Sequence, residues 1–356
     1  MTMVAGRDSA EAPVDGGPEI RDTLARAEAA WLAPLRERFQ AMLDHGRLPH
    51  ALLLLGRQGS GQLELGVWLA ARLLCDRATG PACGACHGCR LFHAGTHPDF
   101  KYISVAPDSS VIRIEQIREL SGILALKSYR GGNKVVLIDP ADAMNINSFN
   151  ALLKTLEEPA GGTFLILTVS RIDRLPRTII SRTMRIRMPL PATADAVTWL
   201  ERREGGRNWR GLLELANGAP FLALHYAEAG LEAMDQQMQE ALDTMDKGRL
   251  DVVGTAEAWS GDNPEARLLW LESWLAGRLR EAALPGDLVN NNRLPWLRAQ
   301  GTHSMIVAGY RLLDALREAR LLVGGALNKQ LLFEGLLVSL VALQNGGAVA
   351  ARELRD

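Results

Sequence analysis

The sequence lacks the features that mark membrane, secreted and autonomous DNA-binding proteins. Its 356 residues contain no apolar run close to the roughly 20 residues that a membrane-spanning helix needs. The N-terminus is rich in Ala, Gly, Asp and Glu and has no basic start followed by an apolar stretch, so it resembles neither a signal peptide nor a transit peptide. The 40 Lys and Arg against 41 Asp and Glu leave a formal net charge of -1, without a basic excess. We therefore expect a soluble, cytoplasmic chain whose DNA contacts are local or shared with partners.

Cysteine is scarce, and its distribution argues against a disulfide framework. The four cysteines lie within one short segment, at Cys75, Cys83, Cys86 and Cys89. In an intracellular chain such a cluster indicates a metal site. Four thiolates complete a closed tetrahedral zinc shell, which leaves no open position for catalysis. We expect structural zinc, with free or redox-active thiols as the alternative and with the histidines at 87, 93 and 97 outside the shell.

Apolar periodicity divides the chain into an α/β front and an all-α back. Short apolar runs alternate with helical patterns up to residue 189, which predicts a parallel sheet covered by helices on both faces. We expect strands at 51–55, 100–105, 134–139, 163–169 and 184–188, with helices at 29–45, 63–74, 114–126, 148–158 and 176–181. Beyond the proline-rich residues 189–191 we expect helices at 192–203, 209–215, 220–226, 264–284, 305–323 and 329–343.

A glycine-rich turn after the first strand has the spacing of a phosphate-binding loop without its chemistry. Gly56 and Gly61 match the two glycines of G-x-x-x-x-G-K-[ST], with Gly59 between them. Gln62 and Leu63 replace the Lys that contacts phosphate and the Ser or Thr that ligates magnesium. Losing two such contacts, at roughly 1.5–3 kcal/mol each, weakens nucleotide binding by about two to four orders of magnitude. The alternative is a turn that only packs.

The acidic motif that nucleotide hydrolases place at the end of a neighbouring strand is also incomplete. The strand at 134–139 ends in Asp139, where a nucleotide hydrolase places an Asp that faces magnesium. Pro140 follows, although a hydrolytic site of this kind would place a Glu there to orient the attacking water. We therefore expect no productive binding of ATP or magnesium and no intrinsic ATPase activity.

Two further segments show a resemblance to a known family. The segment FNALLKTLEEP at 149–159 and the segment LPRTIISR at 175–182 resemble the AAA+ clamp-loader family of DNA replication. The cysteine cluster, followed by GTHPD at 95–99, is similar to the zinc module of bacterial clamp-loader subunits. The resemblance implies a RecA-like AAA+ domain at 29–189 with a zinc-binding insertion at 75–89, a small helical lid at 190–240 and an all-α collar at 241–356. Residues 1–28 are expected to form a disordered extension.

The resemblance also implies roles for individual residues. Arg182 matches the arginine that reaches in trans into the nucleotide site of an adjacent subunit, although Thr183 stands where the family has Cys. Ser170 falls where active members have a polar sensor, and Phe221 appears in place of the lid arginine that contacts nucleotide. No catalytic role is implied for the cysteines.

The resulting expectation is a non-hydrolysing clamp-loader subunit that caps one end of an ATPase ring and supplies an arginine finger. Its implied partners are gamma/tau-type ATPase subunits and delta, with the sliding clamp and primer-template DNA contacted through the complex, rather than further copies of itself. A catalytic subunit of the same machine is one alternative, but it would need Lys at 62, Ser or Thr at 63 and Glu at 140.

Nucleic-acid binding supplies the second alternative. A basic face on the cysteine segment would favour a zinc-dependent nucleic-acid binding module, yet Arg77 and Arg90 are the only Lys or Arg residues between positions 75 and 99. Lys127, Arg130 and Lys134 flank a Gly-Gly loop and are expected to form either a solvated cluster or a phosphate-backbone contact.

Overall fold

The computed structural model describes residues 18–344, apart from residues 78, 107–108, 110, 130, 284–302 and 324–327. The chain divides into two compact units, Met1–Leu190 and Pro191–Asp356. The division falls within the proline-rich segment at which strand patterns end in the sequence. Each unit is described by itself.

The first unit is built on a five-stranded sheet in the order β2-β3-β4-β1-β5, with parallel pairing throughout. The strands are β1 (Ala51–Leu55), β2 (Phe100–Ile103), β3 (Lys134–Ile138), β4 (Thr163–Val169) and β5 (Met184–Arg187). The five predicted strands are confirmed, two of them with the expected bounds. Because the strands are parallel, the segments that follow β1, β3 and β4 meet at one edge of the sheet, where ligands bind in folds of this class.

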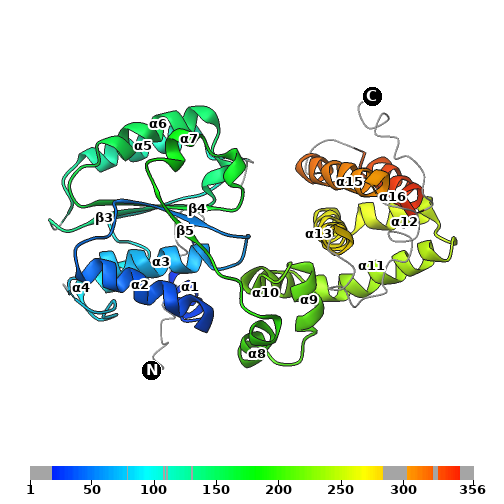
Figure 1. Cartoon of the computed structure of the whole chain (residues 1–356), viewed down its shortest axis with the longest axis horizontal. Helices are drawn as coiled ribbons and strands as arrows, with labels where there is room; N and C mark the ends of the chain where they lie inside the picture. Colours follow the sequence, from blue (N-terminus) through cyan, green and yellow to red (C-terminus); the bar gives the residue numbers. More distant parts are fainter. Residues whose placement is uncertain are drawn as a thin grey trace, which may run out of the picture. The chain divides into compact units, whose positions relative to one another are not determined.

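Helices cover both faces of the sheet (Figure 1). The helices of this unit are α1 (Ile20–Ala27), α2 (Ala33–Asp44), α3 (Gln62–Leu73), α4 (His87–His93), α5 (Ile114–Ala125), α6 (Ile146–Glu157) and α7 (Arg177–Ile180), with short 3-10 turns at Ala30–Leu32, Ala141–Ala143 and Ile172–Arg174. Figure 1 shows α1 to α4 on one face and α5 to α7 on the other. The side chains of β1 and β3 are almost entirely buried, as expected for parallel strands covered on both sides, which read as continuous apolar runs.

Helix α1 corrects one expectation, because it lies in the segment assigned to a disordered extension. Ile20, Thr23 and Ala27 are buried and share one helical face, since they are three and four residues apart. The helix packs against α3, and Arg26 forms an ion pair with Asp22 at 2.6 Å. The prediction of disorder is therefore wrong for residues 20–27, and residues 1–17 lie outside the described residues.

Lys134 also differs from expectation, because it does not belong to a solvated basic cluster. Its side chain is buried, and its ammonium donates hydrogen bonds to the carbonyls of Leu124 and Leu126 at the C-terminal end of α5. A Lys there satisfies backbone acceptors that the helix leaves unpaired. Arg130 lies outside the described residues.

The second unit is helical wherever it has regular secondary structure in the described residues. Its helices are α8 (Thr193–Arg203), α9 (Trp209–Leu215), α10 (Pro220–Glu228), α11 (Leu231–Asp246), α12 (Val252–Gly261), α13 (Pro264–Ala283), α15 (His303–Leu322) and α16 (Lys329–Gln344). Among the described residues, no helix is long and apolar enough to cross a membrane. Buried tryptophans organise the core: the Trp270 indole N–H donates to Asp235 at 2.8 Å, and Trp259 packs edge-on against Phe333.

The expected boundary between lid and collar at residue 240 falls inside α11. Most of the buried apolar residues of this unit form one cluster that extends from Ala196 to Leu343. The Leu231–Asp246 helix contributes Met238 and Leu242 from the two sides of the expected boundary to that cluster. One unbroken helix therefore spans the expected boundary, and the division of this unit into lid and collar stays a prediction.

Candidate nucleotide loop and metal centre

The degenerate phosphate loop joins β1 to α3 through a turn that requires glycine. Gly59 and Gly61 have φ angles of 75° and 115°, in the left-handed region that disfavours other residues. A Cβ on Gly56 would lie 2.5 Å from Ser60 Oγ and 2.6 Å from Met188 Cβ, so this position has no room for a side chain. The glycines are therefore explained by the local backbone and packing, whether or not the loop holds a phosphate.

Gln62 folds back into the loop that it terminates. Its side-chain Nε2 donates to the Gly56 carbonyl at 2.8 Å, and its Oε1 accepts from Ser60 Oγ at 3.0 Å. Both Gln62 and Ser60 are buried, while Leu63 is half-buried and offers no polar atom beyond its backbone. The side chain in the Lys position thus closes the loop with internal hydrogen bonds.

Asp139 follows β3 at the same edge of the sheet and is hydrogen-bonded from two sides. It accepts from the Thr168 hydroxyl of β4 and, at 3.2 Å, from the Tyr102 hydroxyl of β2. Burial raises the pKa of Asp139, while these two hydrogen bonds act in the opposite direction. The carboxylate is held by neighbouring strands, and Pro140 beside it offers no side-chain hydrogen bond.

A second carboxyl group, Glu64, lies near Asp139 and was missed by sequence reasoning. It occupies the first turn of α3 and is 5% exposed. Burial raises the pKa of Glu64 to about 7; the charge of Arg26 on α1 lowers it, and the charge of Asp139 raises it. One signal in the sequence could have identified it, because a lone acid interrupts the apolar pattern LELGVWLAARL.

The two expected sensor positions have local structural partners. The backbone N–H groups of Ser170 and Arg171 donate to the buried carboxylate of Asp142, at 3.2 and 3.1 Å, which fixes the chain after β4. Phe221 is buried in α10 with its ring edge-on to Trp199, the centroids 5.3 Å apart. Phe221 is thus a core residue of the helical unit.

Arg182 lies just beyond α7 and contacts its own chain. Its guanidinium forms an ion pair with Glu157, the last residue of α6, at 2.7 Å and donates to the Thr178 carbonyl at 3.1 Å. The side chains of Arg182 and Glu157 are 38% and 49% exposed. The arginine is therefore at the surface, separate from the group formed by Gln62, Glu64 and Asp139.

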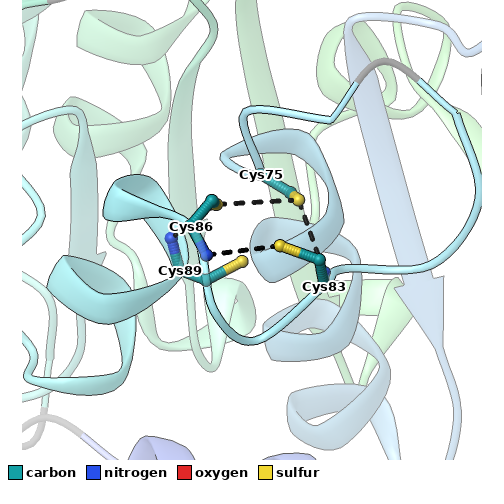
Figure 2. A group of neighbouring side chains, drawn as sticks. All are labelled: Cys75, Cys83, Cys86 and Cys89. Atoms are coloured by element: carbon teal, nitrogen blue, oxygen red, sulfur yellow. Dashed lines mark hydrogen bonds between the residues drawn. The ribbon is translucent and has the colours of Figure 1, made fainter.

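The four cysteines converge at the opposite end of α3 from the loop. Cys75 follows that helix, Cys83 lies in the connecting segment, and Cys86 and Cys89 lie at the start of α4. Figure 2 shows the four side chains gathered around one small space, and their sulfur atoms lie within 4.8 Å of one another. Four sulfurs at about 2.3 Å from a tetrahedral zinc would be about 3.8 Å apart, and the Cys75 and Cys86 sulfurs are 3.9 Å apart.

Backbone N–H groups support these sulfur atoms. Cys83 donates to Cys75, Cys86 to Cys83 and Cys89 to Cys86, at 3.3–3.4 Å. Hydrogen bonds from the backbone of Ala85 and Cys86 lower the pKa of Cys83 to about 6, whereas burial raises the pKa of Cys89. Four thiolates this close repel one another, and a divalent cation among them removes that repulsion. The four residues therefore fit a metal ion and could hold one.

Gly88 shows how closely the cysteine segment is packed. A Cβ at this position would lie 2.3 Å from the Leu74 carbonyl oxygen, and the Gly88 N–H donates to Asp76 at 3.4 Å. Phe92, one turn further along α4, packs edge-on against Phe100 of β2 with ring centroids 4.8 Å apart. The segment is thereby anchored to the sheet through an apolar contact as well as through the chain itself.

The structure brings together only part of the predicted site. Gly56, Gly59, Gly61, Gln62 and Leu63 form one turn, and Asp139 follows a strand at the same sheet edge. Sequence reasoning missed the side chains that engage the predicted ones, namely Tyr102, Thr168, Glu64, Asp142 and Glu157.

Comparison with known proteins agrees with the fold and the motifs. A family model described as DNA polymerase III, delta subunit, matches residues 32–191. The DNA polymerase III subunit delta' of Pseudomonas aeruginosa is 34% identical over 307 residues, which are 84% of this chain and 93% of that protein. The subunit delta' of Escherichia coli is 33% identical over 70% of this chain and 75% of its own. The subunit gamma of Buchnera aphidicola is 31% identical over 51% of this chain and 52% of its own.

These similarities extend through both units and agree with the expected fold class, an AAA+ domain with a parallel sheet followed by helices. The parallel sheet in the order β2-β3-β4-β1-β5, with the glycine-rich loop after the interior strand β1, agrees with the expected α/β front, and the helices that follow agree with the expected all-α back. The chain belongs to the delta' family of DNA polymerase III subunits.

Proposed function

We propose that this chain is a clamp-loader subunit of DNA polymerase III that does not hydrolyse ATP itself and supplies Arg182 to an adjacent ATPase subunit. The observation that carries the proposal is the position of Gln62, which occupies the Lys position and hydrogen-bonds to Gly56 and Ser60 inside its own loop. A neutral amide engaged in this way provides no charge for a γ-phosphate.

The surroundings of Asp139 support the same conclusion. A magnesium ion in a phosphate loop is held by a Ser or Thr hydroxyl and by an Asp on a neighbouring strand. Here Leu63 lacks a hydroxyl, and the carboxylate of Asp139 accepts hydrogen bonds from Thr168 and Tyr102. With Pro140 next in sequence, positions 62, 63 and 140 offer neither a charge for the γ-phosphate, nor a hydroxyl for magnesium, nor a carboxylate for the attacking water.

The partners follow from the family. We propose that the chain assembles with gamma/tau-type subunits and delta, caps one end of their ring, and acts on the sliding clamp and primed DNA through the complex. The relatives named delta' and gamma support such an assembly. Because the subunit has no working site of its own, a ring of identical copies would be inactive.

Zinc is the metal that we propose for the four cysteines, in a structural role. Thiolate ligands favour zinc among the abundant divalent ions, and four of them leave no coordination position for a water molecule or a substrate. The site would fix the segment between α3 and α4 and would contribute nothing to hydrolysis.

The first test is nucleotide turnover by the purified chain. We expect no ATPase activity above background, and Gln62→Lys alone should not restore it, because the groups that bind magnesium and orient water would still be missing. Steady turnover that is lost in Asp139→Ala would show that the loop is catalytic.

The second test concerns Arg182 in the reconstituted complex. We expect Arg182→Ala to leave folding, metal content and assembly unchanged and to lower DNA- and clamp-stimulated ATP hydrolysis several-fold. An arginine finger contributes about 10³–10⁵ in rate at one site, but the intact sites elsewhere in the ring limit the total loss. Hydrolysis equal to wild type at saturating ATP, with assembly confirmed, would leave Arg182 as an ordinary surface residue.

A further inference from the structure

The surface around Arg182 is strongly basic. Between residues 171 and 187 the sequence holds six arginines and one acid, Asp173, in a chain with a formal net charge of -1. Arg177, Arg185 and Arg187 are exposed. Such a concentration of guanidinium groups attracts anions, and phosphate in particular, because the planar group can donate two parallel hydrogen bonds to it.

The sheet register shows that these arginines share the side of the sheet on which α7 lies. Arg185 and Arg187 of β5 pair with Leu53 and Leu55 of β1. Paired residues of parallel strands point to the same face, and both leucines contribute to the core that contains Ile179 of α7. The two arginines of the edge strand and Arg182 therefore belong to one face of the first unit.

Arg182 itself is turned back onto the body of its own unit. Its hydrogen bonds to the Thr178 carbonyl and to Ser181 Oγ are made within its own turn, and its ion pair joins it to Glu157 at the end of α6. We call this position retracted, because the guanidinium pairs with a carboxylate and a carbonyl of its own chain rather than with an anion on another subunit.

We propose that Glu157 is the counter-ion that holds Arg182 in this retracted position, and that a phosphate group presented by an adjacent subunit displaces it. The inference rests on the proposed trans role of Arg182. Glu157 is thus a positioning residue, which sets how readily the arginine is released.

The magnitudes agree with such an exchange. A half-exposed ion pair stabilises its geometry only weakly, by a factor of about 1.4 to 5 in equilibrium terms. A phosphate offers more oxygen acceptors and more charge than a carboxylate, and its hydrogen bonds to guanidinium are among the stronger ones in proteins. Arg177, Arg185 and Arg187 further favour a multiply charged incoming anion over the carboxylate of Glu157.

The full-length chain can be tested with inorganic tripolyphosphate as the probe. We expect tripolyphosphate to shift the Nε–H NMR signal of Arg182, and Glu157→Gln to bind it about two to five times more tightly than wild type. Glu158→Gln is the matched control, because Glu158 is an adjacent exposed acid and its removal changes the net charge equally. In the Arg182→Ala background the difference between the Glu157→Gln and Glu158→Gln variants should vanish.

In the reconstituted complex, Glu157→Gln should lower the ATP concentration for half-maximal hydrolysis, by less than about five-fold because the other sites do not use Arg182, and leave the maximal rate unchanged. A general loss of structure would not produce this separation. Equal tripolyphosphate affinities for Glu157→Gln and Glu158→Gln would overturn the inference, even if Arg182→Ala lowers hydrolysis. Tighter binding by Glu157→Gln, together with wild-type hydrolysis by the Arg182→Ala complex, would instead support the displacement and contradict the trans role.

Discussion

The two ends of helix α3 differ in whether their side chains are arranged to bind a ligand. At its start, the phosphate loop keeps its glycines, but Gln62 hydrogen-bonds to Gly56 and Ser60 and completes the loop from within. Beyond its end, the four cysteine sulfurs lie within 4.8 Å of one another, around a space that suits an ion. One end is satisfied by its own side chains, whereas the other gathers four thiols that could hold a metal ion.

The difference shows that a chain can keep the glycine spacing of a motif without the side chains that bind its ligand. The glycines of the loop are required by positive φ angles and by the close approach of Ser60 and Met188, so the fold needs them without any nucleotide. Convergent thiols have no comparable structural reason, because weak donors and acceptors gain little from mutual contact and thiolates repel one another. The spacing of a motif therefore predicts function best where packing alone gives no reason for those residues.

The largest expected effect comes from breaking the cysteine end. Wild-type protein prepared without added zinc should contain about one zinc per chain, and Cys83→Ser should weaken zinc binding by more than about 100-fold, because losing a ligand costs more than losing its supporting hydrogen bond. We expect proteases to cut the segment between Cys75 and Asp99 while the circular dichroism of the sheet is kept. The conservative control is Ala82→Ser beside it. If wild type contains clearly less than one equivalent of zinc, the cysteine end of α3 binds no ion tightly and does not differ from the loop end in this respect.

The loop end should respond to pH through Glu64. Its pKa is raised to about 7 in the folded protein, mainly by burial. The folded state therefore binds more protons than the unfolded state between about pH 4.5 and 7, and the free energy of unfolding falls as pH rises through this window, by up to about 3 kcal/mol. Glu64→Gln should remove this loss and raise stability at pH 8.

Urea denaturation across pH 4.5 to 8 measures the effect. Glu37→Gln, at an exposed position of α2, is the control for loss of a surface charge. If Glu64→Gln and wild type have parallel stability curves, the carboxyl group titrates normally, and the loop end is less desolvated than the structure indicates.

The elements were predictable where one local pattern determines them. Apolar runs such as Ala51–Leu55 and Thr163–Val169 are buried on both faces, so their length and composition identified the strands. Helix α1 was missed because its buried face rests on Ile20, Thr23 and Ala27, only one of which is strongly apolar. The expected boundary at residue 240 falls inside α11, whose buried residues continue on both sides of it.

The candidate site was predictable only as far as motifs reach. The cysteines, the glycines, Gln62 and Asp139 stand at recognisable spacings, and the structure places them at the two ends of α3 and at one sheet edge. The partners of these residues come from distant segments: Tyr102 and Thr168 reach Asp139 from different strands, and Glu157 reaches Arg182 from another helix. Such pairings depend on the tertiary fold, which no short spacing encodes. Lys134 was misassigned although its carbonyl partners are near in sequence, because a Lys beside other basic residues does not reveal that its side chain is buried at the end of α5.

The smallest expected effect tests whether Gln62 is a structural part of the loop or only a remnant of a lost Lys. Gln62→Ala removes the donor to the Gly56 carbonyl and the acceptor for the Ser60 hydroxyl. Leaving these buried groups unpaired should lower the free energy of unfolding by about 1–2 kcal/mol. Gln58→Ala is the matched control, because Gln58 is the same residue type at an exposed position of the same loop, and its replacement should change stability by less than about 0.5 kcal/mol. Chemical denaturation of both variants under identical conditions decides the matter. Equal free energies of unfolding for the two variants would mean that the Gln62 amide does not stabilise the loop. The contrast between the loop end and the cysteine end of α3 would then be lost.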